Sequence, residues 1–194
     1  LYLARSFGLK VPETIITNDP KKARDFYEKY KGNIIFKMQK MPIIDDNGIK
    51  KTILTNRVSP ENLSNFDQVR NCPSLFQEHI DKLYEIRLTA IGNKLFPIAI
   101  YSQKSDYSKD DFRRYDFKNV NYELVEIPTN ISDKIFRLNK YYNLHYSTID
   151  LIFTPNKEYV FLEINPNGQY LWTEEMSKCS ITDYFADFLS GKND

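Results

Sequence analysis

The sequence has little of the residue types on which many catalytic and metal sites depend. Its 194 residues include only two cysteines, Cys72 and Cys179, and two histidines, His79 and His145. Both pairs are too widely separated for a CxxC pair or a His-based zinc site. We therefore expect free thiols in a reducing compartment and a cytoplasmic location.

Long apolar runs and an excess of one charge are also missing. No run approaches the roughly 20 residues that a membrane-spanning helix needs, and no signal-peptide pattern opens the chain. The 27 Lys and Arg against 26 Asp and Glu leave a net charge of +1, whereas phosphate contacts to nucleic acid require a cationic excess. We predict no membrane partner and no nucleic-acid partner.

The chain does contain enough apolar material for a packed core. Hydrophobic residues make up 41% and aromatic residues 14%, which excludes a disordered chain. Turn signals at 46–48, 92–93 and 155–157 join runs of β-branched and aromatic residues, with helical patterns between other runs. The sequence predicts an α+β fold with mostly antiparallel sheets in two lobes, 1–73 and 74–191.

The last predicted hairpin carries the strongest candidate site. Glu163 and Asn165 are two residues apart on a strand, so they share a face, together with Phe161. A two-residue loop at 156–157 would pair Asp150 with Glu163, and two opposed carboxylates repel by on the order of a few kcal/mol. Mg²⁺ or Mn²⁺ would reverse that repulsion, because both ions prefer oxygen ligands. The alternative is a solvated hairpin whose acidic residues point to water.

Two cations on predicted strands are further candidates. Lys37 interrupts an apolar strand, where an ammonium group needs an anionic partner such as phosphate; the alternative is an edge-strand lysine that discourages pairing. Arg87 shares a face with Glu85 and Thr89 and is suited to grip a carboxylate or phosphate. The alternative for Arg87 is a half-exposed sheet whose polar face meets solvent.

Three other segments carry weaker signals. The backbone of residues 76–82 is suited to read a base edge, although no side-chain pattern demands it. The charged loop 104–119 holds Arg113 and is either a substrate-binding loop or a self-neutralising turn. Gly168, directly after the acidic strand, indicates a tight turn or a close approach of the backbone to a ligand.

Taken together, these residues resemble the ATP-grasp ligases over nearly the whole chain. The segment most similar to the metal-binding strands of that superfamily is STIDLIFTPNKEYVFLEINPNGQYLW. The segments similar to its peptide-maturing, microviridin-type (graspetide) branch are FGLKVPETIITNDP, SLFQEHIDKLYEIRLTAIGNKLF and EINPNGQYLW. Ligases of that branch form ester or amide crosslinks between side chains of a ribosomally made precursor peptide.

The resemblance implies a role for each candidate residue. Mg²⁺ bridging the ATP phosphates would be bound by Asp150, Glu163 and Asn165, with Mn²⁺ as the alternative ion. The phosphates would be contacted by Lys37, and the adenine by a hinge of Gln77, Glu78, His79 and Ile80. The transferred phosphate would be stabilised by Arg87, and substrate or phosphate would be held by Arg113, which lies in an Asp-Phe-Arg element where the branch has Asp-Trp-Arg.

The resemblance also implies a reaction and a partner. ATP would phosphorylate a carboxylate of the precursor peptide, and an amine or hydroxyl would attack the acyl phosphate. The alternatives are a ligase that adds glutamate or another amino acid to a protein tail, a non-catalytic nucleotide-binding module and a structural domain. Because the chain starts at Leu1, we expect a fragment without the usual N-terminal domain. As a separate departure from the family, the glycine-rich loop that covers the phosphates in many members is represented only by residues 45–48. Whether the protein forms a homodimer is left open.

Overall fold

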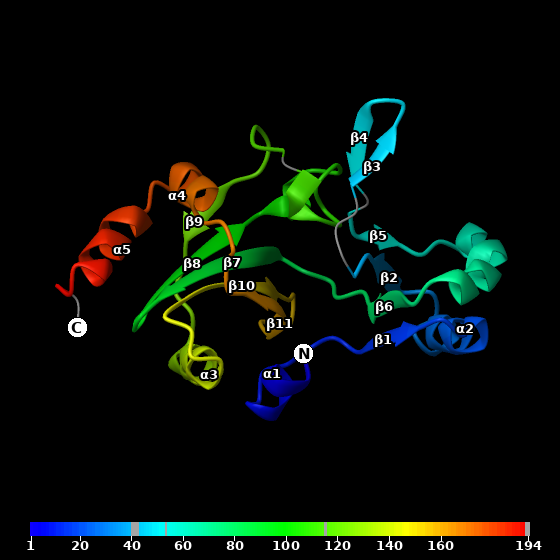
Figure 1. Ribbon diagram of the computed structural model, residues 1–194, viewed down its shortest axis with the longest axis horizontal. Coiled ribbons are helices and arrows are strands. Elements are labelled where there is room, and N and C mark those ends of the chain that lie inside the picture. The colour runs from blue at the N-terminus through cyan, green and yellow to red at the C-terminus, as the bar shows by residue number, and fades with distance from the viewer. Residues whose placement is uncertain (40–42, 53, 115, 193–194) are drawn as a thin grey trace. The chain divides into compact units, whose positions relative to one another are not determined.

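The computed structural model describes residues 1–39, 43–52, 54–114 and 116–192. Short helices and antiparallel strands follow one another along the chain (Figure 1), so the predicted mixed, mostly antiparallel fold is confirmed. The chain packs into two compact units. Unit 1 comprises Leu1–Val11, Asp81–Asp106 and Asp116–Asp194, and unit 2 comprises Pro12–Ile80 and Tyr107–Tyr115. The predicted division between residues 73 and 74 stays a prediction about lobes, since the packed units are interleaved in sequence.

Unit 2 is built on a four-stranded antiparallel sheet in the order β1-β6-β2-β5. Its strands are β1 (Thr14–Thr17), β2 (Ile34–Lys37), β5 (Asn56–Arg57) and β6 (Ser74–Glu78). A separate hairpin joins β3 (Ile43–Asp46) to β4 (Ile49–Thr52). Its turn residues Asn47 and Gly48 have φ values of 56° and 83°, as the predicted Asn-Gly turn requires.

Two helical elements form the core of unit 2 with this sheet. Helix α2 (Pro20–Lys29) begins where the Asp19 carboxylate accepts a hydrogen bond from the Lys21 amide at 2.9 Å, as the Asp-Pro pair predicts. The 3₁₀ helix η1 (Pro60–Asn71) follows Ser59. Side chains from both elements and from β2 and β6 form one apolar cluster, which includes Ala23, Phe26, Ile34, Phe66 and Phe76.

Unit 1 is built on a five-stranded antiparallel sheet in the order β11-β10-β7-β8-β9. Its strands are β7 (Tyr84–Ile91), β8 (Lys94–Ile100), β9 (Tyr122–Leu124), β10 (Tyr146–Phe153) and β11 (Tyr159–Asn165). The two-residue loop Gly92-Asn93 joins β7 to β8, as predicted. The 3₁₀ turn η2 (Ser102–Lys104) follows β8, and η3 (Phe112–Arg114) lies in unit 2.

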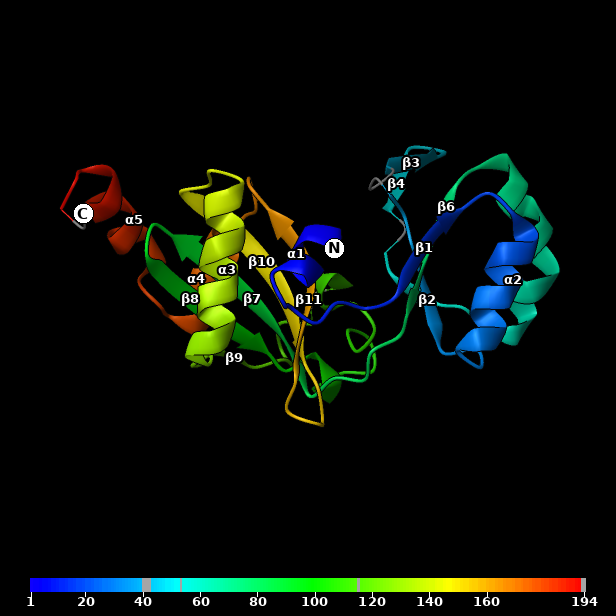
Figure 2. The ribbon, with the colours of Figure 1, turned by 90° about the horizontal axis from the view of Figure 1, so that it is seen from below.

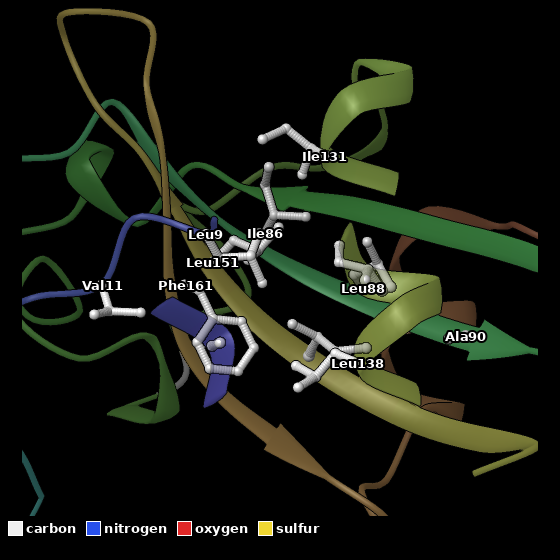
Figure 3. Close-up of a cluster of buried hydrophobic side chains, with 12 residues drawn as sticks. Leu9, Val11, Ile86, Leu88, Ala90, Ile131, Leu138, Leu151 and Phe161 are labelled. Carbon is white, nitrogen blue, oxygen red and sulfur yellow. The ribbon is translucent and has the colours of Figure 1, made fainter. Parts of the chain in front are cut away.

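Helices cover both faces of the unit 1 sheet. On one face, α1 (Tyr2–Ser6) and α3 (Thr129–Tyr141) close the main core (Figures 2 and 3), with Leu88, Ile135, Leu138, Ile149 and Leu151 almost fully buried. On the other face, α5 (Ile181–Leu189) contributes to a smaller, largely aromatic cluster. Helix α4 (Leu171–Ser177) packs against α5 and β9. None of the helices in the described parts of the chain is long and apolar enough to cross a membrane.

Candidate functional site

The antiparallel register of unit 1 aligns polar side chains in rows across three strands. Asp150 of β10 lies opposite Arg87 of β7 on one side and opposite Glu163 of β11 on the other. One step along, Thr148 lies opposite Asn165. The residues between them in sequence belong to the apolar core, so these polar side chains occupy the opposite face of the sheet.

The pairing of Asp150 with Glu163 confirms the prediction, but it results from a different loop length and a bulge in the strand. Next to the turn Phe153 pairs with Tyr159, so the loop is longer than the predicted two residues. A bulge then skips Leu162 and shifts the register by one residue. The predicted placement of Phe161 on the face of Glu163 is wrong, because the bulge turns Phe161 into the core, where it is 2% exposed.

Arg87 and Asp150 form a buried ion pair. The guanidinium Nη1 donates to both Asp150 oxygens, at 2.9 and 3.1 Å, and Nη2 donates to the Gln169 carbonyl at 3.1 Å. The two side chains are only 10% and 13% exposed, and the neighbours Glu85 and Thr89 are also buried. The alternative interpretation, in which this polar face meets solvent, is therefore wrong.

The electrostatics around Asp150 suit a cation. Burial raises the pKa of Asp150 to about 6; the Arg87 guanidinium lowers it and the charge of Glu163 raises it. Arg87 pairs with Asp150, whereas Glu163 on the next strand is exposed, so the two carboxylates beside one guanidinium leave an excess negative charge that solvent reaches at Glu163. Asp150, Glu163 and the Asn165 amide offer only oxygen donors, the ligands that Mg²⁺ prefers, so the residues fit this ion.

The third donor of this set has to be the amide. Within the described residues, no group of three or more His, Cys, Asp or Glu side chains could hold a metal. The Asn165 Oδ1 atom already accepts a hydrogen bond from the Asn167 amide at 3.1 Å. That bond orients the oxygen and leaves it a second lone pair.

Lys37 and Gln77 lie in unit 2. Lys37 is the last residue of β2, which lies between β6 and β5. The edge-strand interpretation of Lys37 is therefore wrong. Gln77 is 3% exposed, and its Nε2 atom donates to the Thr14 hydroxyl at 2.8 Å.

The predicted hinge residues Glu78, His79 and Ile80 follow directly. The Glu78 amide donates to the Glu13 carbonyl and the His79 amide to the Asn33 carbonyl, both at 2.9 Å. Directly after Ile80 the chain passes into unit 1. The hinge segment thus lies where the packing of the chain changes from one unit to the other, and its contact with adenine stays a prediction.

Arg113 also belongs to unit 2 and is paired with Asp111, two residues before it. Its Nε and Nη2 atoms donate to the two Asp111 oxygens at 2.8 and 2.6 Å, and the Thr55 amide donates to Asp111 at 3.0 Å. Burial alone would raise the pKa of Asp111, but the hydrogen bonds and charge of Arg113 outweigh burial and lower it to about 2. These bonds fasten the segment around Arg113 to the residues before β5.

The structure therefore gathers four of the ten predicted residues in one place. The four are Arg87, Asp150, Glu163 and Asn165, and the six in unit 2 are Lys37, Gln77, Glu78, His79, Ile80 and Arg113. Sequence reasoning missed Tyr146, whose hydroxyl donates to the Gly168 carbonyl, and the Gln169 carbonyl on Arg87. The signal that pointed to this turn was Gly168.

A family model described as the RimK-like ATP-grasp domain matches residues 2–189. The chain belongs to this family. No curated protein matches the chain in sequence. The predicted ATP-grasp fold is confirmed.

Solved structures extend this result to one branch. The chain is 31% identical to a RiPP-associated ATP-grasp ligase from Chryseobacterium gregarium, solved with ADP and a leader and core peptide; the match covers 100% of this chain and 58% of that one, with a TM-score of 0.92. It is also 31% identical to the macrocyclase MdnC from Microcystis aeruginosa MRC, bound with its precursor peptide MdnA, over 98% and 58% of the two chains, with a TM-score of 0.86.

The ATP-grasp ligase PsnB has the same fold. Its structure, complexed with a phosphomimetic variant of a minimal precursor, Mg and ADP, is 22% identical over 100% of this chain and 57% of that one, with a TM-score of 0.77. The chain thus spans less than two thirds of the length of each of these ligases. The predicted resemblance to peptide-maturing ATP-grasp ligases is confirmed.

Proposed function

We propose that the protein is an ATP- and Mg²⁺-dependent ligase that crosslinks side chains of a ribosomally made precursor peptide. The observation that carries the proposal is the row of Arg87, Asp150 and Glu163 across three strands, in which Arg87 and Asp150 form a buried ion pair. It occurs in a chain that is 31% identical to two ligases solved with their peptides. A precursor peptide is therefore the proposed partner, and the cytoplasmic location and a homodimer stay predictions.

The carboxylate pair would hold the metal. Asp150, Glu163 and Asn165 present oxygen donors, and the excess negative charge of the pair favours a divalent cation over none. When bound, Mg²⁺ supplies positive charge that offsets the ATP phosphates. Mn²⁺ remains the alternative ion, because it accepts the same oxygen donors.

Arg87 would stabilise the charge that develops on the transferred phosphate. Its guanidinium is held by Asp150 and the Gln169 carbonyl, and its buried Nε has no partner among the described residues. A cation fixed in a site with little water is more effective than one that must reorganise. The Arg87 guanidinium therefore retains hydrogen-bonding capacity for an anionic oxygen.

The proposed reaction has two steps. A substrate carboxylate oxygen attacks the γ-phosphorus of ATP, ADP leaves, and an acyl phosphate forms. An amine or hydroxyl of the same peptide then attacks the acyl carbon, inorganic phosphate leaves, and an amide or ester bond results. No Ser, Cys or His nucleophile is needed, because catalysis rests on positioning and charge stabilisation.

The residues of unit 2 would contribute to binding. By the resemblance, Lys37 contacts the phosphates, the segment Gln77 to Ile80 contacts the adenine, and Arg113 holds substrate or phosphate. The Gln77 side chain is occupied by Thr14, so its predicted contact would have to come from the backbone. The Arg113 side chain is 37% exposed on an otherwise anchored segment, so solvent reaches it.

Mass spectrometry of the co-expressed precursor peptide tests this function. We expect one water lost per bond formed, and no loss with Glu163→Gln. The matched control is Glu175→Gln, an exposed position on α4, which should keep the water loss. A mass gain of one amino acid would instead identify a ligase that extends a protein tail, and ATP binding without ADP release would identify a non-catalytic module.

A further inference from the structure

The turn that follows β11 lies directly on Arg87. Two successive carbonyls of this turn are held by side chains from the sheet. The Gly168 carbonyl accepts a hydrogen bond from the Tyr146 hydroxyl, and the Gln169 carbonyl accepts one from Arg87 Nη2 at 3.1 Å. Tyr146 and Arg87 are therefore connected through two successive peptide units of the turn.

The turn packs so closely that only glycine fits. A Cβ atom at Gly168 would overlap the Thr148 hydroxyl and would lie 2.9 Å from Arg87 Nη2. The φ angle of Gly168 is not positive, so the requirement comes from space and not from backbone conformation. Because the backbone lies against the guanidinium, any displacement of the turn moves the Gln169 carbonyl relative to Arg87.

Several buried polar atoms beneath the turn have no hydrogen-bond partner among the described residues, so none of them holds the Arg87 guanidinium in place of the Gln169 carbonyl. Arg87 Nε and the hydroxyls of Thr89 and Thr148 are buried without a hydrogen-bond partner in the described parts of the chain. Thr89 and Thr148 lie opposite each other on β7 and β10, in the row next to Arg87. The guanidinium is thus fixed by Asp150 on one side and by the turn on the other.

The Tyr146 ring is itself held firmly. It stacks on Phe185 of α5 with centroids 5.1 Å apart and an interplanar angle of 8°, and it makes an edge contact with Tyr170 at 6.1 Å. Helix α5 is anchored by Ile181, which is fully buried. The position of the Tyr146 hydroxyl is therefore set by the aromatic cluster, and not by the turn that it holds.

We propose that Tyr146 is a positioning residue for Arg87. Its hydroxyl holds the Gly168 carbonyl, the next carbonyl holds the guanidinium, and the guanidinium holds Asp150. The Tyr146 hydroxyl is the part of this connection that a substitution can remove, since the carbonyls belong to the backbone. The catalytic consequence rests on the proposed function, whereas the positioning itself does not.

The variant Tyr146→Phe tests the positioning without any activity. It removes one oxygen and keeps the ring that stacks on Phe185. The ¹⁵N–¹H signal of Arg87 Nε, assigned by its loss in Arg87→Lys, should exchange with water about tenfold faster in Tyr146→Phe, because a looser guanidinium opens more often. Tyr170→Phe, in the same aromatic cluster, should leave this exchange unchanged. An equal exchange rate in Tyr146→Phe and the unmodified protein would overturn the proposal.

Turnover of ATP with Mg²⁺ and the precursor peptide tests the consequence. We expect kcat of Tyr146→Phe to fall about tenfold with little change in the KM for ATP, as for loss of a contact that matters mainly in the transition state. An unchanged kcat, or an equal fall in Tyr170→Phe, would overturn the catalytic consequence. If the unmodified protein shows no turnover with its precursor, the proposed function fails while the exchange measurement still decides the positioning.

Discussion

The single charge of Glu163 has opposite effects on two properties of the site, the stability of the free protein and the binding of a divalent ion. Its carboxylate lies opposite Asp150 and raises the pKa of that buried group, which is unfavourable in the free protein. The same charge is what a divalent ion needs. A residue whose charge opposes folding but favours ligand binding is expected at a functional site and not in a structural pair.

The variant Glu163→Gln separates these two properties. We expect Mg²⁺-dependent ATP turnover to fall about 100-fold, because one metal ligand loses its charge. The pKa of Asp150 should fall below about 6, since the repelling neighbour is gone, and the free energy of unfolding without metal should not decrease. Kinetics, a carboxyl NMR titration and urea unfolding measure the three effects. Equal losses of stability and activity would indicate a structural role instead.

Gly168 is the second position of interest, because one added carbon atom there is expected to lower the stability of the fold. Gly168→Ala should lower the free energy of unfolding by about 1–3 kcal/mol, because the added methyl group must displace the turn or Thr148. Adding Thr148→Ala should recover only part of this loss, because the Cβ atoms would still be 2.8 Å apart. Urea unfolding of the single and double variants measures both changes.

The matched control for this prediction is Gly191→Ala. No atom lies within 4 Å of a Cβ at that position, although its φ is +73°. It should therefore cost only the backbone strain of about 1 kcal/mol. If Thr148→Ala restored no stability to Gly168→Ala while Gly191→Ala cost as much, steric overlap at the turn would not be the cause.

At the scale of elements, the last hairpin shows what the sequence could and could not predict. Alternation placed Glu163 and Asn165 on one face, and the structure agrees. The bulge at Leu162 was not predictable from that pattern, because alternation carries no information on contacts with distant segments. The Phe161 amide donates to the Lys10 carbonyl at 2.8 Å, and this contact lies on the far side of β11 from its partner strand.

Loops were predicted less well than strands for the same reason. The charged segment 104–119 was predicted as a loop, which fits its short 3₁₀ turns. Its attachment to unit 2 through Asp111 and Thr55 has no signature in a local pattern of charges. Helix α4 was not predicted at all, since no apolar stripe of helical spacing marks it.

The attachment of this segment predicts a pH dependence of stability. The pKa of Asp111 is lowered from 3.8 to about 2 in the folded protein, so the ionised form stabilises the fold above pH 4. This contribution is lost as the pH falls from about 4 to about 2, and amounts to about 2 kcal/mol. Urea unfolding at several pH values should show this loss in the unmodified protein but not in Asp111→Asn.

The control for this pH dependence is Asp110→Asn. It removes the neighbouring ion pair with Arg57 but keeps Asp111 and its four hydrogen-bond donors. Its loss of stability between pH 4 and pH 2 should match that of the unmodified protein. The same slope in Asp111→Asn would mean that other carboxylates cause the acid sensitivity.

At the scale of the whole molecule, the resemblance to a family predicted more of the site than the composition did. Composition excluded classes of protein, and alternation located the carboxylate pair. Neither could assign roles to Lys37, Arg113 or the segment from Gln77 to Ile80, because these residues lie in the other unit. Their roles come from the family and stay predictions, whereas the four residues of unit 1 stand together on their own geometry.

Binding of ATP should stabilise the folded protein in a way that depends on both the metal and the carboxylate pair. A ligand at about 100 times its Kd adds about 2.7 kcal/mol to the free energy of unfolding, which for a chain of this size raises Tm by roughly 5–10 °C. Calorimetric scans with ATP and Mg²⁺ should show this rise. EDTA should remove most of it, because the phosphates and the carboxylates then repel each other without an intervening cation.

Glu163→Gln should abolish the part of this stabilisation that depends on Mg²⁺, whereas Glu175→Gln should keep it. A rise that persists in EDTA would place the nucleotide away from the carboxylates, and no rise at all would leave a structural domain that binds no nucleotide.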